Sequence, residues 1–137
     1  MLKPYAFRLT QGADLKLAIL NFVQTHSIQA GSLLSGVGCL ASANIRLANE
    51  SQSLSLAGPL EILTLAGTLT PTHVHLHISV ADKNGAVYGG HLMDGSEVLY
   101  TTEICLASYE NLAFKRERDS ATGFDELVVE HVSDSNE

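Results

Sequence analysis

The chain has 137 residues and a formal net charge of −7, because 15 aspartates and glutamates outnumber 8 lysines and arginines. This balance argues against direct binding to DNA or another polyanion, since neutralising phosphates requires a basic stripe that the sequence lacks. No stretch approaches the roughly 18 apolar residues of a membrane span and the first residues have no long apolar core, so we expect a cytoplasmic protein without membrane contact.

The first predicted elements are a strand and a helix. Residues 5–9 alternate in polarity and predict a strand that ends at Gln11-Gly12. Asp14 suits the N-cap of a helix. Apolar residues then recur at helical spacing on one face; they are Leu15, Ala18, Ile19, Phe22 and Val23. We expect this helix to span residues 14–26 and to be the main helix of the chain.

The following part of the chain has the period of two that is typical of strands. It predicts three short strands, at residues 32–39, 43–47 and 54–56. Residues 60–69 follow and are apolar on most of both faces, which predicts a strand buried in the interior of the sheet. Glu61 begins that strand. A buried carboxylate needs a partner. Glu61 could accept hydrogen bonds from a backbone turn, pair with an arginine or bind a metal-bound water; we favour a structural role.

Residues 73–92 hold four of the six histidines. Polar and apolar side chains alternate here, so a strand would place the polar ones on one face; these are His73, His75, His77 and Ser79. Gly89-Gly90 removes side chains just before His91, where another backbone or a ligand could approach.

The turn after this strand decides whether His91 joins the same face. A two-residue loop at Asn84-Gly85 would place His91 on the apolar side. A three-residue loop that ends with Gly85 in the left-handed conformation would instead place it opposite His77. We favour the second register, because it also sets His75 diagonal to His91 and lets three imidazoles converge.

Three neutral imidazoles are a common ligand set for zinc, with a fourth position left for water or a small ligand. Spacing alone leaves open a partly solvated histidine cluster without metal. His73 lies one step further out and is expected to line the site, as is Ser79. Imidazole also suits nickel, copper and iron, so the expected cofactor is zinc or another divalent transition metal.

The rest of the chain predicts further strands. Residues 98–109 form a long one in which Glu103 is a second candidate for a buried acid and, like Glu61, for a residue that lines the site. Residues 115–118 are a basic run of the kind that forms a solvated edge, so we assign no nucleic-acid-binding residue. Residues 126–129 predict a last short strand. We expect one domain over residues 3–131 and an acidic, flexible tail at residues 132–137.

These elements predict an α+β fold, with two layers and a mostly antiparallel sheet covered by one main helix. A single helix covers only one face of such a sheet. We therefore expect the other face to be covered by self-association.

Four segments taken together resemble the plants-and-prokaryotes-conserved (PPC) domain family, in its stand-alone bacterial and archaeal form. The resemblance extends from about Tyr5 to Val129. The segments are Gly36-Val37-Gly38, the run from Gly58 to Thr68, the run from His75 to Asp82, and the run from Gly85 to Leu92.

The resemblance implies a single α+β domain that assembles as a homotrimer, with a metal site at His75, His77 and His91. In plants the domain follows an AT-hook that inserts Arg-Gly-Arg into the minor groove of DNA. This sequence has no Arg-Gly-Arg. The oligomerisation and metal features are thus carried by residues that are present, and the DNA-binding motif is not.

Two functions compete, beside a third possibility in which the histidine cluster is empty and the protein is a scaffold only. The first is a non-enzymatic, metal-containing homotrimeric module with a regulatory, DNA-binding or ligand-binding role and a small-molecule or protein partner. The second is a zinc enzyme, in which the open position activates water and Glu61 or Glu103 accepts the proton. We prefer the first, because the sequence offers no Ser-His-Asp arrangement and places neither acid beside the histidines. No catalytic residue is assigned.

Overall fold

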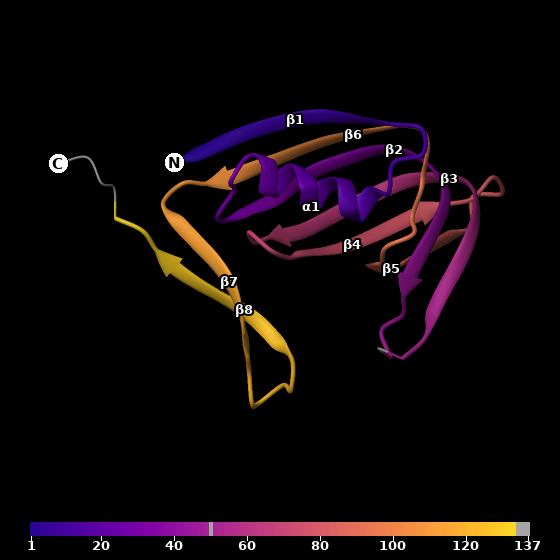
Figure 1. Cartoon of the computed structure of the whole chain (residues 1–137). Coiled ribbons are helices and arrows are strands. Elements are labelled where there is room, and N and C mark those ends of the chain that lie inside the picture. The colour runs from indigo at the N-terminus through magenta and orange to yellow at the C-terminus, as the bar shows by residue number, and fades with distance from the viewer. Residues whose placement is uncertain (50, 134–137) are drawn as a thin grey trace.

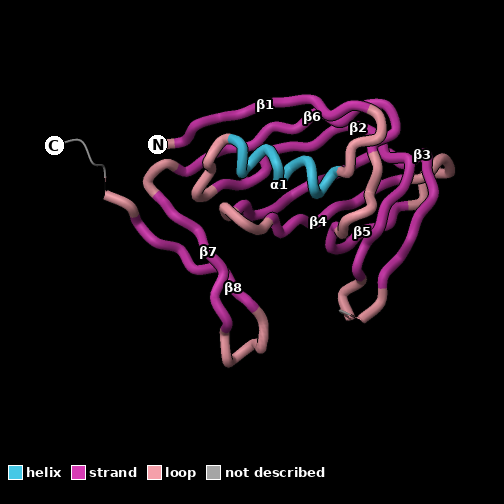
Figure 2. The backbone as a smooth tube through the Cα atoms, viewed as in Figure 1, coloured by secondary structure: helices cyan, strands magenta, loops and turns pink. Residues whose placement is uncertain are grey.

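The computed structural model describes residues 1–49 and 51–133. Within them the chain forms one helix and eight strands (Figures 1 and 2). In chain order these are β1 (Leu2–Thr10), α1 (Leu15–Thr25), β2 (Gly31–Arg46), β3 (Ser53–Leu69), β4 (Val74–Ala81), β5 (Val87–Leu92), β6 (Val98–Tyr109), β7 (Leu112–Arg118) and β8 (Asp125–His131).

Six strands form one antiparallel sheet in the order β1-β6-β2-β3-β4-β5. β5 also pairs with the end of β2, where Ile45 faces Leu92 and Arg46 faces His91, so the strands β2 to β5 close into a ring. β7 and β8 form a separate two-stranded sheet, which leaves the body as an arm (Figure 1). The predicted antiparallel sheet with one main helix is confirmed, but the two-layer description omits this arm.

The helix α1 lies over one face of the sheet (Figure 2). Asp14 caps it, because the backbone N–H of Leu17 donates to Oδ1 of Asp14 at 3.1 Å. Its buried side chains pack with those of the sheet; the cluster includes Leu15, Ile19, Val23, Leu40, Ile45, Leu69, Leu76 and Leu106. In the described part of the chain, no helix has the length and apolar character needed to cross a membrane.

Two strands are longer than the sequence predicts. The segments 32–39 and 43–47 are parts of the single strand β2, because β-bulges bend that strand without ending it. The segments 54–56 and 60–69 likewise both belong to β3. Gly58 lies inside β3, where a Cβ would sit 2.5 Å from the carbonyl oxygen of Leu40. That glycine therefore marks close packing of two strands and not a chain break.

β3 lies between β2 and β4, so its predicted interior position is confirmed. The prediction that both of its faces are buried is wrong. Leu60, Ile62 and Leu65 point into the core, whereas Leu63 is 49% exposed and Glu61 is exposed. Glu61 therefore stays in contact with water and needs no internal partner.

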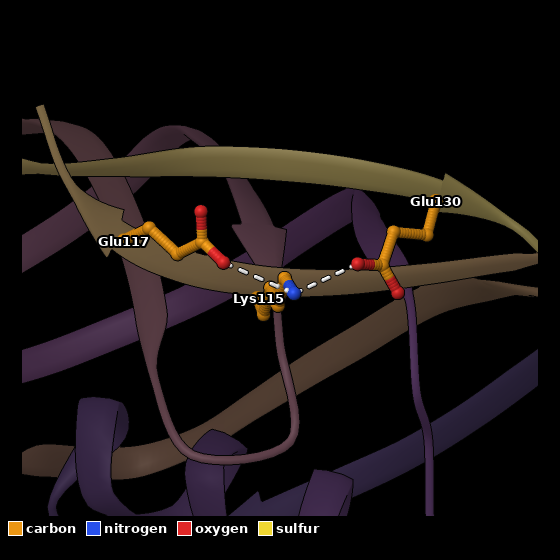
Figure 3. A network of polar contacts seen from close by, with 3 residues as sticks. All are labelled: Lys115, Glu117 and Glu130. Atoms are coloured by element: carbon orange, nitrogen blue, oxygen red, sulfur yellow. Dashed lines mark ion pairs between the residues drawn. The ribbon is translucent and has the colours of Figure 1, made fainter.

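Glu103 is also exposed, opposite Arg8 of β1 and Val37 of β2, so the prediction of a second buried acid is wrong. The basic run at residues 115–118 lies in β7. There Lys115 pairs with Glu117 at 3.0 Å and with Glu130 of β8 at 2.8 Å (Figure 3). All three side chains are about half exposed, so solvent screens these pairs and they contribute little to stability.

Candidate metal centre

The turn between β4 and β5 has the three-residue form, as predicted. Asp82 and Ala86 close it, since the N–H of Asp82 donates to the carbonyl oxygen of Ala86 at 2.9 Å. Gly85 has a φ of +81°, in the left-handed region that glycine adopts at low cost. Oδ1 of Asp82 accepts the N–H groups of Asn84 and Ala86. These bonds fix the register in which His77 faces His91.

That register brings three imidazoles together. One potential ligand atom from each of His75, His77 and His91 lies within 4.8 Å of the other two. The ring centroids are 5.0 Å apart for His75 and His77, 5.1 Å for His75 and His91, and 6.0 Å for His77 and His91. We call these residues the histidine triad.

The triad fits a transition metal by donor type and by spacing. Zinc–nitrogen bonds of about 2.0–2.1 Å place tetrahedral ligand atoms about 3.4 Å apart. Small side-chain rotations therefore bring the three nitrogens from their present separations to bonding positions.

Close backbone packing holds His91 in place. A Cβ on Gly90 would lie 2.7 Å from the carbonyl oxygen of Arg46 and 2.7 Å from Cγ2 of Ile45. Only a residue without a side chain lets β5 pair with β2 here. The expectation that Gly89-Gly90 admits another backbone is confirmed: β2 approaches at Gly90, and at Gly89 the carbonyl oxygen of Ile78 on β4 lies 2.9 Å from where a Cβ would be.

Of the hollows that adjoin the triad, two include His91 in their walls. The first, of about 420 Å³, is lined by all three triad rings together with Arg46 and Thr64. The second, of about 500 Å³, lies between the triad and the arm. Its walls consist of Lys16, Arg46, His73, His75, His91, Met93, Arg116, Phe124, Asp125 and Glu126. His75, His91 and Arg46 thus border both spaces.

The family model of the Plants and Prokaryotes Conserved (PCC) domain, also written PPC, matches residues 1–110. The chain belongs to the PCC domain family. The resemblance read from the sequence motifs is therefore confirmed. The arm lies beyond the matched residues.

Similar proteins and structures extend this assignment. The bifunctional protein GlmU of a Synechococcus strain is 43% identical over 134 residues, which are 98% of this PCC chain and 22% of that protein. The chain thus spans about a fifth of the length of that relative. A solved protein from Salmonella enterica is 33% identical with a TM-score of 0.92, covering 96% of this chain and 95% of the other. A solved metal-containing protein from Archaeoglobus fulgidus is 30% identical with a TM-score of 0.78, covering 92% and 93%.

The electrostatics of this PCC domain favour neutral rings. Burial, followed by the nearby Arg46 guanidinium, lowers the pKa of His91 from 6.5 to about 4. Burial and the neighbouring His77 lower the pKa of His75. Because a metal binds the unprotonated nitrogen, these two rings are ready to act as ligands at neutral pH.

The remaining predicted site residues divide into two groups. His73 has its ring centroid 6.4 Å from that of His75 and lines the second hollow, and burial, with Arg116 next in effect, lowers its pKa. Ser79 hydrogen-bonds through Oγ to Oγ1 of Thr64 at 2.6 Å, beside the first hollow. Glu61 and Glu103 line neither hollow.

The sequence analysis missed the cations around the triad. Lys16 comes from α1, Arg46 from β2 and Arg116 from β7, so no local spacing links them to the histidines. Only the pairing of β5 with β2 and the path of the arm bring them together. The one sequence signal was the position of Arg46 near the end of a predicted strand. Nothing comparable marked Lys16 or Arg116.

Proposed function

We propose that this PCC-domain chain is a metal-binding module. It holds zinc or another divalent transition metal through His75, His77 and His91, and presents the fourth coordination position to a small ligand. The observation that carries the proposal is the convergence of three ligand nitrogens within 4.8 Å. The metal-containing Archaeoglobus fulgidus relative, at 30% identity over 92% of this chain, supports it.

Metal analysis tests this proposal directly. Tag-free protein is loaded with zinc, dialysed against a weak chelator and measured by elemental analysis. We expect about one zinc per chain in the wild type, and less than about a tenth of that in His75→Ala and His91→Ala, since removing one of three ligands destroys the site.

His131→Ala is the matched control, because His131 is an exposed histidine on β8 outside both hollows. This variant is expected to keep the zinc content of the wild type. Equal zinc content in all four proteins would contradict the assignment of the site.

We further propose that the module works as a homotrimer. α1 covers one face of the sheet, while apolar side chains remain exposed on its strands: Leu34 is 62% exposed, Val37 57% and Leu63 49%. Exposed apolar area of this kind favours association with another protein surface, and other copies of the same chain are the simplest partners.

A zinc enzyme is the second candidate. The observation in its favour is that Asp125 and Glu126 line the same hollow as His75 and His91, so a proton acceptor borders the open coordination position. Hydrolysis of small activated esters by the zinc-loaded protein, lost on chelation, would support catalysis. DNA binding is less well supported, because the net charge of the chain is −7. An electrophoretic mobility shift assay with random duplex DNA at low salt tests it.

A further inference from the structure

The second hollow concentrates positive charge in an acidic chain. Lys16, Arg46 and Arg116 are three of the eight lysines and arginines, and they reach this one space from three separate elements. Two of them, Arg46 and Lys16, lie close enough to His91 to lower its pKa. Their convergence beside the triad is therefore a property of the folded chain and not of a local basic run.

Among the described residues, these cations form no ion pair with a carboxylate. Within residues 1–49 and 51–133, both ion pairs shorter than 4.0 Å are made by Lys115, so none joins Lys16, Arg46 or Arg116 to a carboxylate. Nε of Arg116 is shielded from solvent and has no hydrogen-bond partner among the described residues. A shielded donor without a partner costs free energy unless a ligand fills the gap.

Two acids also line the hollow. Asp125 and Glu126 lie on the arm, so the five charged side chains sum to one positive charge. An anion in the hollow is therefore attracted by the three cations and repelled by the two carboxylates of the arm. This arrangement favours a small oxyanion that can lie nearer to the three cations than to Asp125 and Glu126.

We propose that the hollow binds a small oxyanion, a carboxylate or phosphate group, held by Arg46, Arg116 and Lys16 with one oxygen directed at the open position of the metal. The part that concerns the metal rests on the function proposed above. A guanidinium offers paired N–H donors that match the oxygens of both groups, which is why the two share one site. The hollow, at about 500 Å³, falls in the size range of small-molecule sites.

Calorimetric titration with inorganic phosphate, and separately with acetate, tests the proposal on zinc-loaded and on metal-free protein. Arg46→Gln and Arg116→Gln are each expected to weaken binding of the anion by about tenfold, the usual effect of losing a charge-assisted hydrogen bond. Lys16→Gln should weaken it less, and Asp125→Asn should strengthen it by removing a like charge. Whichever of the two anions binds more tightly identifies the preferred group.

Lys83→Gln is the matched control, because Lys83 carries the same charge as Lys16 but lies in the turn between β4 and β5, outside both hollows. It is expected to bind both anions as the wild type does. Normal zinc content together with equal anion affinity in wild type, Arg46→Gln and Arg116→Gln would overturn the oxyanion site and leave the metal site standing.

If the wild type takes up no zinc, the metal proposal fails and the metal-free titrations judge the oxyanion site alone. Weaker binding in the two arginine variants than in Lys83→Gln would then support the site. Absence of binding to either anion, or equal binding in every variant, would overturn it.

Discussion

The chemistry of the triad depends on the protonation of individual rings. His75 and His91 are half-buried, and His91 lies beside a fixed positive charge on Arg46. Both conditions disfavour the imidazolium form. A ring kept neutral in this way can bind a metal without first losing a proton, so the proposed metal site would compete for metal ions at pH values where an ordinary histidine is protonated.

This shift makes the metal-free protein sensitive to acid. The pKa of His91 is about 4 in the folded chain against an ordinary value of 6.5. Between these values the unfolded chain binds more protons, so the contribution of His91 to the free energy of unfolding is complete above pH 6.5 and is lost as the pH falls toward 4. Urea unfolding over this range should show a steeper loss in the wild type than in His91→Gln.

The protonation of the His91 ring can also be measured directly. In an NMR titration of metal-free protein, the imidazole signals of His91 should keep their neutral positions down to a midpoint near pH 4. A midpoint near 6.5 would contradict the environment described for this residue.

At the scale of elements, the site depends on how β5 is held between β4 and β2. The turn at residues 82–86 sets the pairing of β5 with β4. The missing side chain of Gly90 allows β5 to pair with β2 on its other edge. His91 belongs to both pairings, because it faces His77 on β4 and Arg46 on β2.

Gly90→Ala should therefore release metal without removing a ligand. The added methyl group would overlap the Arg46 carbonyl and Ile45, which should push β5 away from β2 and cost about 1–3 kcal/mol of stability. We expect at least about tenfold weaker zinc binding, measured by competition with a chromophoric chelator, because His91 moves with β5.

Gly12→Ala separates this effect from a general loss of stability. Gly12 has a φ of +90°, and the nearest atom to an added Cβ is Oε1 of Glu97 at 3.8 Å. The substitution strains the backbone by about 1–2 kcal/mol at a residue that lies outside both hollows and does not pair with β5. Zinc affinity should stay at the wild-type value, and an equal decrease in both variants would contradict the proposed role of Gly90.

The same elements show what the sequence can predict. Alternation between His73 and Val80, with Gly85 in the turn, was sufficient to predict the strand, the register and the convergence of the triad, because all of these depend on local geometry. The prediction that Glu61 is buried was wrong for a different reason. Residues 60–69 are apolar on both faces, and a single sequence does not reveal which face the helix covers. The cations were missed because their proximity depends on long-range pairing.

At the scale of the whole molecule, the sheet has one face under α1 and one that offers apolar side chains to solvent. Val37 lies on the exposed side of β2, opposite Glu103 of β6. A charge at this position should oppose association between copies of the chain while leaving the core intact, since the side chain is 57% exposed.

Light scattering coupled to size exclusion tests the proposed trimer. The wild type should elute with three times the 14.6 kDa mass of the chain, and Val37→Glu should shift toward a single chain with its zinc content retained. Leu17→Glu is the control, because Leu17 is 48% exposed but lies on α1. A wild-type mass of one chain, or an unchanged mass in Val37→Glu, would contradict the proposal.

The arm adds one consequence for how this protein diverges. All three triad histidines lie before residue 110, where the family match ends, whereas Arg116, Asp125 and Glu126 lie after it. The triad and two of the three cations, Lys16 and Arg46, thus lie within the family match, whereas the third cation and both acids lie beyond it. Substitutions in the last fifth of the chain, after residue 110, would therefore alter the proposed oxyanion site while leaving the three histidines of the proposed metal site unchanged.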